Sequence, residues 1–399
     1  MIEIYHKEKI AFLDKDNKTI FLNYQTNNIL DSISLSLPST QKLYTWEYRF
    51  PPYFEMFLPE GYLYEIFKNI LSKKYGYVDD YLIFELLANN IENRITFKTD
   101  KKVKQFENIE LDDIIQNDTT DTFNKLLNMF LEKNAISGVQ PKTIALIKDK
   151  ESLNLKEYII KTWGDEFPYL AENEYICMKI LKKANIPTAN VILSKNKKFL
   201  IVEKFIYENN QILGFEEILS LMDKNKINKY QGSYEQIAKI IHSFVSNPKE
   251  DMKNFFKLIV MNFYLKNGDA HLKNFGLLFK DDFSKIWFAP AYDVINTVVY
   301  IFKDTPALTL NSKKVWWNDE ELIKFGKKYC LLNNKEITNI INECKTALYF
   351  GIKYIQQYIK NNPHFKNIGK KMIDTFNLSL ENKTIKRIDN ELIRNWKHY

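Results

Sequence analysis

The sequence of 399 residues is poor in cysteine, glycine, proline and arginine, and each shortage argues against a class of protein. Its 3 cysteines are widely spaced and form no CxxC pair, which excludes a disulfide scaffold and favours buried thiols in a reducing compartment. With 11 glycines and 11 prolines, long flexible linkers are not expected. Arginine, the preferred side chain for bidentate contacts with phosphates and base edges, occurs at only four positions. The net charge of +7 therefore indicates a lysine-rich solvated surface rather than a nucleic-acid groove.

Long apolar runs are also missing. The start of the chain, MIEIYHKEKIAFLDKD, carries charges throughout and contains no apolar signal core. The most apolar window, FFKLIVMNFYL, is interrupted by Lys257 and Asn262 and is too short to span a bilayer. Hydrophobic residues make up 45% of the chain and charged residues 27%, which is typical of a globular protein with a sizeable core. We expect a soluble cytoplasmic protein of two or three packed units that does not contact membranes.

The first hundred residues have a mixed pattern. KIAFLDKDNKTIFLNY alternates around a polar turn and predicts a hairpin, and SISLSLP (Ser32–Pro38) alternates strictly and predicts a strand. Helical spacing follows in residues 51–76 and 79–90. The composition then becomes polar, and residues 98–125 are the best candidate for a linker.

The rest of the chain changes from strands to helices. KTIALIKD, EYIIKTW and FLIVEKF are strand-like runs, and between them LAENEYICMKILKKANIP predicts a helix that Pro187 ends. After about residue 206 the chain is helical, and Ser233 with Gln236 forms a capping-box pattern at one helix start. This order predicts an α+β fold with three domains: residues 1–105, 106–206 and 207–399.

The decapeptide NGDAHLKNFG concentrates polar chemistry between two apolar stretches. In an extended segment, Asp269, His271 and Lys273 would point to one side. Asn274 follows five residues after Asp269, and Asp293 lies nineteen residues beyond Asn274 in APAYDV. An amide and a carboxylate suit Mg²⁺, and the remaining acid could accept a proton from an attacking hydroxyl. This spacing fits the protein-kinase template, although the HRD and DFG motifs are absent.

Other interpretations of the decapeptide stay open. A zinc site would need further His or Cys ligands nearby, and the sequence contains only 5 histidines. A purely structural polar turn and a metal-dependent hydrolase are two alternatives. A catalytically silent, kinase-shaped binding module or co-repressor is a third.

A second polar constellation surrounds Gly138 in AISGVQPKTIALI. The side chains of Ser137, Gln140, Lys142 and Thr143 flank this glycine, where a turn leads into the predicted strand. Backbone N–H groups at such a turn can hold the phosphate oxygens of a nucleotide. The stretch is neither a Walker A sequence nor a GxGxxG loop, so an ordinary hairpin is the alternative.

A lysine inside an apolar strand adds to this pattern. Lys161 lies within EYIIKTW, and a buried charge is costly unless it is paired. Glu174, in the helix that follows, is a natural partner. A strand lysine paired with a helix glutamate holds nucleotide phosphates in kinases. FLIVEKF, further along, resembles the strand and connector that offer backbone groups to an adenine ring.

Together these motifs identify a family resemblance. ISGVQPKT, IIKTW, NEYICMKIL, VEKF, GDAHLKNF and PAYDV resemble the HipA-like serine/threonine kinases, the toxins of HipBA-type toxin–antitoxin systems. ALTLNSKK, and upstream SISLSLP and FEMFLPEGYLYEIF, are similar to further parts of the family, so the resemblance covers most of the chain. It implies a two-lobed, protein-kinase-like fold. The N-terminal lobe would be mixed α/β and carry an extra subdomain, and the C-terminal lobe would be mainly helical.

The resemblance implies roles for the residues of the decapeptide. Asp269 would be the catalytic base, and Asn274 and Asp293 would bind Mg²⁺. His271 and Lys273 would flank the reacting phosphoryl group, where the lysine would counter its charge.

It also implies how ATP is held and how activity is controlled. Lys161 would hold the ATP phosphates, and Glu203 and Phe205 would lie at the adenine-binding connector. Relatives inactivate themselves by autophosphorylating a serine in the phosphate-binding loop, at one or both of two positions. Here Ala135 occupies the first position, so Ser137 is the expected autophosphorylation site.

The resemblance further implies partners. A helix-turn-helix, HipB-like antitoxin would bind the chain, and DNA would be bound only indirectly, through that antitoxin. The substrate would be a protein of the translation machinery, and aminoacyl-tRNA synthetases are known targets within the family.

Overall fold

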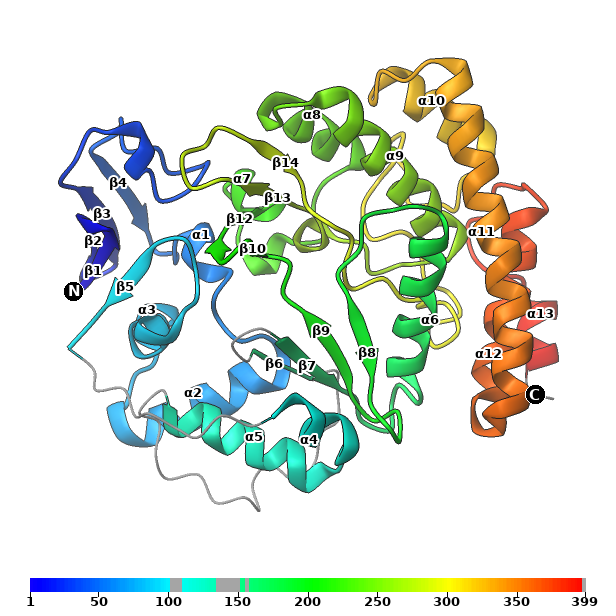
Figure 1. Cartoon of the computed structure of the whole chain (residues 1–399), viewed down its shortest axis with the longest axis horizontal. Coiled ribbons are helices and arrows are strands. Elements are labelled where there is room, and N and C mark those ends of the chain that lie inside the picture. The colour runs from blue at the N-terminus through cyan, green and yellow to red at the C-terminus, as the bar shows by residue number, and fades with distance from the viewer. Residues whose placement is uncertain (101–109, 134–150, 155–157, 397–399) are drawn as a thin grey trace. The chain divides into compact units, whose positions relative to one another are not determined.

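The computed structural model describes residues 1–100, 110–133, 151–154 and 158–396, which fold into two compact units (Figure 1). Each unit is assembled from separate stretches of the chain. Unit 1 consists of Met1–Pro168, Ile192–Ile227 and Leu278–Ser284, and unit 2 consists of Tyr169–Val191, Asn228–Leu277 and Lys285–Tyr399. None of the helices in the described part of the chain is both long and apolar enough to cross a membrane. The domain boundaries expected from sequence stay a prediction.

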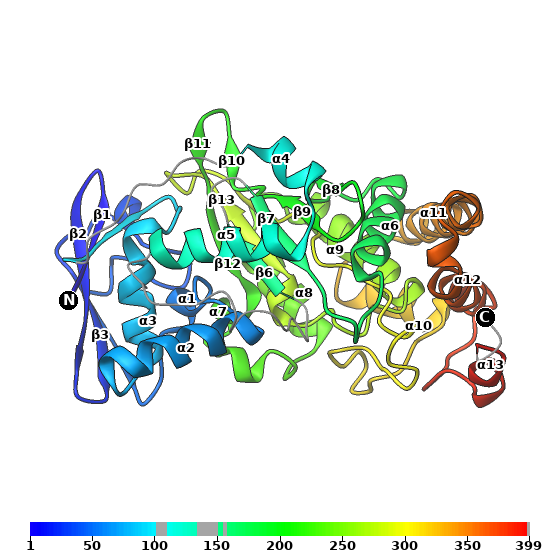
Figure 2. The same cartoon turned by 90° about the horizontal axis from the view of Figure 1, so that it is seen from below.

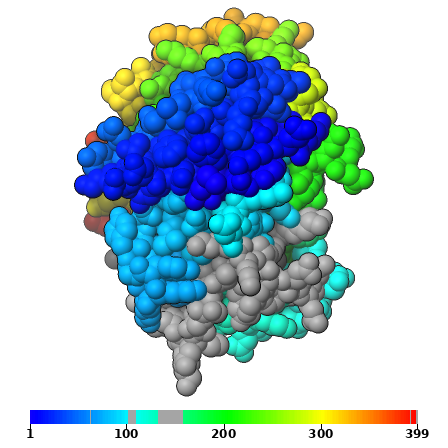
Figure 3. Space-filling model, turned by 90° about the vertical axis from the view of Figure 1, so that its left-hand side faces the viewer, coloured from blue at the N-terminus to red at the C-terminus, as the bar shows by residue number. Residues whose placement is uncertain are grey.

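Unit 1 begins with a five-stranded antiparallel sheet of order β4-β3-β2-β1-β5, whose strands are labelled in Figure 1. Figure 2 shows β1, β2 and β3 from another side. Its strands span Ile2–His6 (β1), Glu8–Asp16 (β2), Thr19–Tyr24 (β3), Leu43–Glu47 (β4) and Thr96–Lys98 (β5). Along β3 every second residue is buried, so one face of the sheet lines the core. Strands β2 and β3 form the predicted hairpin, in which Asn17 adopts the left-handed conformation that such a tight turn needs. The start of the chain, dark blue in Figure 3, forms a continuous band across the face shown there.

Helices cover the buried face of this sheet. They span Pro52–Glu55 (α1), Gly61–Tyr75 (α2) and Asp80–Leu87 (α3), close to the helical stretches that the sequence predicts. The core between sheet and helices is rich in phenylalanine: the rings of Phe84 and Phe97 meet edge to face at 5.3 Å, and Phe54 contacts both. Such edge-to-face contacts add to the stabilisation from burial.

The strand predicted for Ser32–Pro38 is wrong. The segment is a series of bends, because its serines are hydrogen-bonded inward instead of facing solvent. Ser32 and Ser34 are buried, and the backbone N–H of Ser36 donates to Glu216 at 3.1 Å. The alternation of serine with apolar residues therefore does not mark the two faces of a strand here, because the short hydroxyl side chains form hydrogen bonds with nearby backbone groups. Burial raises the pKa of Glu216, although hydrogen bonds from Ser34, Ser36 and Ser220 oppose the shift.

The linker predicted for residues 98–125 is also wrong in its described part. Two helices, Leu111–Gln116 (α4) and Thr120–Lys133 (α5), occupy it. Between them the buried carboxylate of Asp118 accepts hydrogen bonds from the Ser194 hydroxyl at 2.5 Å and the Asn196 amide at 2.7 Å. The polar residues of this stretch therefore lie at the starts of helices, and Asp118 binds a second segment of the chain.

A second sheet in the chain has the order β6-β7-β9-β8. Its strands span Glu151–Asn154 (β6), Tyr158–Thr162 (β7), Val191–Leu193 (β8) and Leu200–Glu203 (β9). The predicted strands EYIIKTW and FLIVEKF are confirmed as β7 and β9, which pair antiparallel, whereas KTIALIKD lies outside the described residues. Short elements not predicted from sequence follow: Tyr207–Glu208 (β10), Gln211–Ile212 (β11), Gly214–Glu217 (β12) and Ile218–Leu221 (α7).

Unit 2 is mainly helical. Its helices span Leu170–Lys183 (α6), Tyr234–Phe244 (α8), Pro248–Tyr264 (α9), Asp319–Lys328 (α10), Asn334–Asn361 (α11), Lys366–Leu380 (α12) and Asn390–Asn395 (α13). The long α11 packs against α6, α9 and α12 (Figure 1). The predicted capping box at Ser233 and Gln236 is confirmed, and so are the buried thiols of Cys177, Cys330 and Cys344. Two short strands, Gly276–Phe279 (β13) and Ile286–Phe288 (β14), follow the decapeptide.

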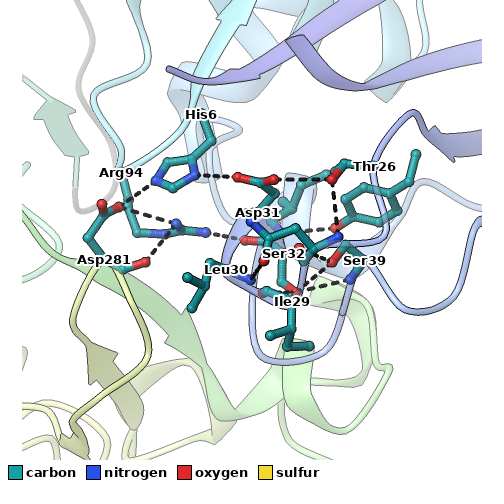
Figure 4. Close-up of polar contacts among 12 residues, drawn as sticks. His6, Thr26, Ile29, Leu30, Asp31, Ser32, Ser39, Arg94 and Asp281 are labelled. Atoms are coloured by element: carbon teal, nitrogen blue, oxygen red, sulfur yellow. Dashed lines mark hydrogen bonds and ion pairs between the residues drawn. The ribbon is translucent and has the colours of Figure 1, made fainter. Parts of the chain in front are cut away.

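A partly buried charged cluster in unit 1 connects the first sheet to the loop after β13 (Figure 4). The two ring nitrogens of His6 contact the carboxylates of Asp31 at 3.0 Å and Asp281 at 2.8 Å. Burial by itself would raise the pKa of Asp281, but the hydrogen bonds and charges of His6 and Arg94 outweigh it, so this pKa lies below its ordinary value. The resulting stabilisation is present above the ordinary aspartate pKa and is lost as the pH falls through the lowered value.

Arg94 is the centre of this cluster. Its guanidinium donates to the Asp281 carbonyl at 3.1 Å and to the Ser32 carbonyl, and it lies 4.9 Å from the ring centre of Phe283. The side chain is only 1% exposed. Replacing Arg94 with alanine removes charged hydrogen bonds and a cation–π contact together, so we expect the free energy of unfolding to fall by about 2–4 kcal/mol in chemical denaturation.

Arg49 provides the matched control for this prediction. It pairs with Asp223 at 2.5 Å, also within unit 1, but both side chains are solvent-exposed. Replacing Arg49 with alanine should therefore cost less than about 1 kcal/mol. Equal losses in the two variants would contradict the structural role assigned to Arg94.

Candidate active site

The decapeptide connects α9 to β13 in unit 2, and it is not extended. Asp269 lies in a turn, and Leu272–Asn274 forms a single 3-10 turn. Backbone N–H groups close both turns: that of His271 donates to the Asp269 carbonyl at 2.8 Å, and that of Asn274 donates to the His271 carbonyl at 2.9 Å. The expectation that an extended segment aligns the side chains of Asp269, His271 and Lys273 is therefore wrong.

The end of α9 supports the first residues of the decapeptide. The side-chain amide of Asn267 donates to the Asn262 side chain at 3.0 Å, and its backbone N–H donates to the Asn262 carbonyl at 2.9 Å. Lys266 has a positive φ of 55°, and its amine donates to the Phe263 carbonyl at 3.2 Å. Burial lowers the pKa of Lys266 to about 7. Buried polar side chains thus fix the point at which the chain leaves the helix.

Asp269 is the single acidic residue of the decapeptide, and its side chain is 33% exposed. The Tyr230 hydroxyl donates to its Oδ1 at 2.7 Å, and Nε2 of His271 lies 3.9 Å from the same oxygen. The Tyr230 and His271 rings pack edge to face at 5.1 Å. A hydroxyl group can therefore approach this carboxylate at hydrogen-bonding distance, which is the geometry a general base requires.

The two expected metal ligands lie side by side. The side-chain amide of Asn274 donates to Oδ2 of Asp293 at 3.3 Å, and its oxygen accepts from the His271 N–H at 3.2 Å. The Tyr292 hydroxyl donates to the Lys273 carbonyl at 2.6 Å and ties the two segments together. Mg²⁺ uses carboxylate and amide oxygens as ligands when phosphates and water complete its shell, so the residue types at these two positions fit that ion.

The structure thus brings five of the expected residues together in unit 2: Asp269, His271, Lys273, Asn274 and Asp293. The side chains of His271 and Lys273 are buried, at 6% and 9% exposure. Their burial favours a role in holding the loop as well as any role toward a ligand.

The remaining expected residues fall elsewhere. Lys161 is buried on β7, Glu203 ends β9, and the Phe205 ring packs edge to face on Phe215 at 5.5 Å, all within unit 1. Glu174 is fully buried on α6 in unit 2, so its pairing with Lys161 stays a prediction. The expected phosphate-binding residues lie outside the described part of the chain: Ser137, Gly138, Gln140 and Lys142.

Sequence patterns missed Tyr230, which contacts the proposed base. Tyr230 contacts Asp269 from 39 residues upstream, in the bend before the Ser233 capping box. A single tyrosine in a polar bend carries no motif that would mark it. The backbone of this bend helps to bring it to the decapeptide, because the Leu272 N–H donates to the Lys229 carbonyl at 3.1 Å.

Comparisons with known proteins identify the family of the chain. Residues 134–349 match the HipA-like C-terminal domain, and residues 4–93 match the HipA N-terminal domain. A Haemophilus influenzae protein named "Putative kinase" is 30% identical over 245 residues, covering 52% of this chain and 71% of that protein. "Putative kinase Y4dM" of Sinorhizobium fredii is 23% identical over 334 residues, covering 75% of this chain and 77% of that protein.

A solved structure shows the shared fold. A chain of the Shewanella oneidensis MR-1 toxin–antitoxin complex of HipA, HipB and operator DNA superposes with a TM-score of 0.70. The match covers 96% of this chain and 98% of that chain at 15% sequence identity. At this identity the likeness establishes the fold, and the chemistry has to be argued from the site.

Proposed function

Since this chain belongs to the HipA family, we propose that it is an ATP- and Mg²⁺-dependent serine/threonine protein kinase that acts as the toxin of a toxin–antitoxin system. The observation that carries the proposal is the contact between Asn274 and Asp293 beside Asp269. One base and two oxygen ligands, brought together by a turn and a following segment, are the parts that phosphoryl transfer requires.

The reaction follows from these residues. Asp269 accepts the proton of a serine or threonine hydroxyl as its oxygen attacks the γ-phosphorus of ATP, and ADP leaves with the bond electrons. The 2.7 Å contact from the Tyr230 hydroxyl supports this role, because it has the length expected between a base and an acceptor hydroxyl. Asn274 and Asp293 would hold Mg²⁺, which would neutralise part of the charge on the phosphates. Lys273 adds a positive charge next to this pair.

Nucleotide binding is assigned to residues of the strand-rich region. Lys161 holds the phosphates and pairs with Glu174, and the backbone at Glu203 and Phe205 binds the adenine ring. The burial of Lys161 on β7 supports this assignment, since a buried ammonium needs an anionic partner or ligand. The loop with Ser137, Gly138, Gln140 and Lys142 cradles the phosphates.

Partners complete the proposal. A helix-turn-helix, HipB-like antitoxin binds the chain and carries it to operator DNA, and the kinase substrate is a translation component such as an aminoacyl-tRNA synthetase. Expression of the chain alone in a bacterial host should stop growth, and Asp269→Asn should relieve the arrest at equal protein level. Growth arrest that persists in this variant would separate toxicity from phosphoryl transfer and contradict the proposal.

Ser137 is proposed as the self-inactivation site. After incubation with ATP and Mg²⁺, peptide mapping by mass spectrometry should find one phosphoryl group on Ser137, and the activity of the wild type should decline as it accumulates. Ser137→Ala should keep its activity throughout the same incubation. Phosphate found elsewhere with Ser137 unmodified would contradict this assignment, and Ser152→Ala serves as a nearby serine control.

A further inference from the structure

The residue before the proposed base is held by a buried threonine. The Gly268 N–H donates to Oγ1 of Thr297 at 2.9 Å, and the Thr297 N–H donates to the Lys266 carbonyl at 3.3 Å. Thr297 is 6% exposed. Its hydroxyl has a single proton and two acceptors within reach, the carboxylate of Asp304 and the Lys266 carbonyl at 3.2 Å. An ionised carboxylate is the stronger acceptor, so the hydrogen bonds run from Gly268 to Thr297 to Asp304.

These three residues are packed without spare room. A Cβ atom added to Gly268 would lie 1.9 Å from Oδ2 of Asp304 and 2.7 Å from Oγ1 of Thr297. Only glycine permits this close approach, but glycine leaves its own backbone dihedrals unrestricted. The hydrogen bond that the Gly268 N–H donates to Thr297 restricts the backbone of residue 268, which directly precedes Asp269 in the chain.

Asp304 is kept in a place that is unfavourable for its charge. Burial is the main cause that raises its pKa, and the negative charge of Asp269 raises it further. Hydrogen bonds from Thr297 and from the Thr305 N–H at 2.9 Å act in the opposite direction, as does the charge of Lys314. Burial and a nearby negative charge are both unfavourable for an ionised carboxylate. The position of Asp304 next to a proposed catalytic group therefore indicates a functional requirement more than a gain in stability.

One stretch of chain joins both halves of the site. Asp293 contacts Asn274, and four residues later Thr297 contacts Gly268. The segment from Asp293 to Asp304 therefore holds the metal-ligand pair at one end and the base loop at the other. A shift of the Thr297 hydroxyl would move the base relative to the metal ligands.

We propose that Thr297 and Asp304 are positioning residues. Asp304 fixes the direction of the Thr297 hydroxyl, which holds the Gly268 amide and thereby sets Asp269 relative to Asn274 and Asp293. The inference rests on the proposed kinase activity for its effect on rate, but the hydrogen bond itself can be tested without that activity.

Thr297→Val and Thr297→Ser form the matched pair for the test. Valine keeps the shape and removes the hydroxyl, whereas serine keeps the hydroxyl. Thr297→Val should lower kcat about 10- to 100-fold with KM for ATP within about twofold, because a small misplacement of a catalytic group is costly. Thr297→Ser should stay within about threefold of the wild type. Equal kcat in all three proteins, or equal losses in both variants, would overturn the proposal.

Asp304→Asn separates positioning from stability. The amide nearly matches the carboxylate in size but has one acceptor oxygen, whereas the carboxylate accepts from Thr297 with one oxygen and from the Thr305 N–H with the other. Asp304→Asn should therefore lower kcat about 10-fold or more without lowering the melting temperature. A purely structural role for Asp304 predicts a lower melting temperature and an unchanged kcat for the folded fraction, which would overturn the assignment.

Hydrogen exchange gives a readout that does not depend on activity. The Gly268 amide should be protected in the wild type and in Thr297→Ser, and it should exchange at least about tenfold faster in Thr297→Val. If the wild type transfers no phosphate, the proposed function fails, and this exchange result still decides whether Thr297 holds the loop. Unchanged protection in Thr297→Val would overturn the inference by itself.

Discussion

Asp269→Asn is expected to reduce phosphoryl transfer from ATP to protein by about 1,000-fold, the range over which a lost general base acts. Asparagine has nearly the same size, and its oxygen can still accept the hydrogen bond from the Tyr230 hydroxyl, which measures 2.7 Å in the wild type. It cannot accept a proton from the attacking hydroxyl, so the loss should appear in the single-turnover rate while ATP binding persists. Rapid-quench measurement with labelled ATP is the direct assay.

Asp282→Asn is the matched control for this change. Asp282 is an exposed acid in the loop after β13, where its carboxylate accepts from the Ser284 hydroxyl at 2.6 Å. This substitution removes the same charge within fifteen residues of the site and should leave the rate unchanged. A rate for Asp269→Asn that matches the control would remove Asp269 from the role of base.

Asp293→Asn should also abolish most activity, but with a different signature. Exchanging a carboxylate for an amide removes a charged Mg²⁺ ligand, which weakens metal binding by at least about tenfold and lowers the rate at ordinary Mg²⁺ by about 100-fold. Part of the rate should return as the Mg²⁺ concentration rises, because excess ion compensates for weaker binding. The measurement is the rate as a function of Mg²⁺ concentration.

The contrast between the two substitutions is the informative result. Excess Mg²⁺ should not rescue Asp269→Asn, since that variant lacks a proton acceptor and keeps its metal ligands. The contact between Asn274 and Asp293 predicts that Asn274→Ala resembles Asp293→Asn in its Mg²⁺ dependence. If Mg²⁺ rescued Asp269→Asn and left Asp293→Asn inactive, the two roles would have to be exchanged.

The regular elements were the part of the fold that the sequence could predict. Helices α8 and α11 repeat apolar residues at helical spacing and bury one side, so their period reports their packing directly. Helix α9 shows the same spacing, but it is buried on all sides from Phe255 to Tyr264. Segments whose polar residues face inward misled the prediction. Ser32 and Ser34 are buried and imitate the polar face of a strand, and Asp118 is a buried anchor inside a stretch that resembles a linker.

The sequence could likewise predict only some of the residues at the candidate site. Asp269, Asn274 and Asp293 could be named because phosphoryl transfer imposes their chemical types and spacing. Tyr230 and Thr297 could not, since they act on the loop from 39 residues before Asp269 and 29 residues after Gly268. Their partners are a single carboxylate oxygen and a backbone amide, and such contacts depend on tertiary packing. No local pattern in the sequence encodes them.

The most direct test of the kinase assignment is the transfer of the labelled γ-phosphoryl group of ATP to protein, followed by identification of the modified amino acid. We predict phosphoserine or phosphothreonine with the wild type and Mg²⁺, and none with Asp269→Asn or after chelation of the metal. ATP binding without label on any protein would point to a catalytically silent binding module. That result, or label that survives Asp269→Asn, would contradict the account.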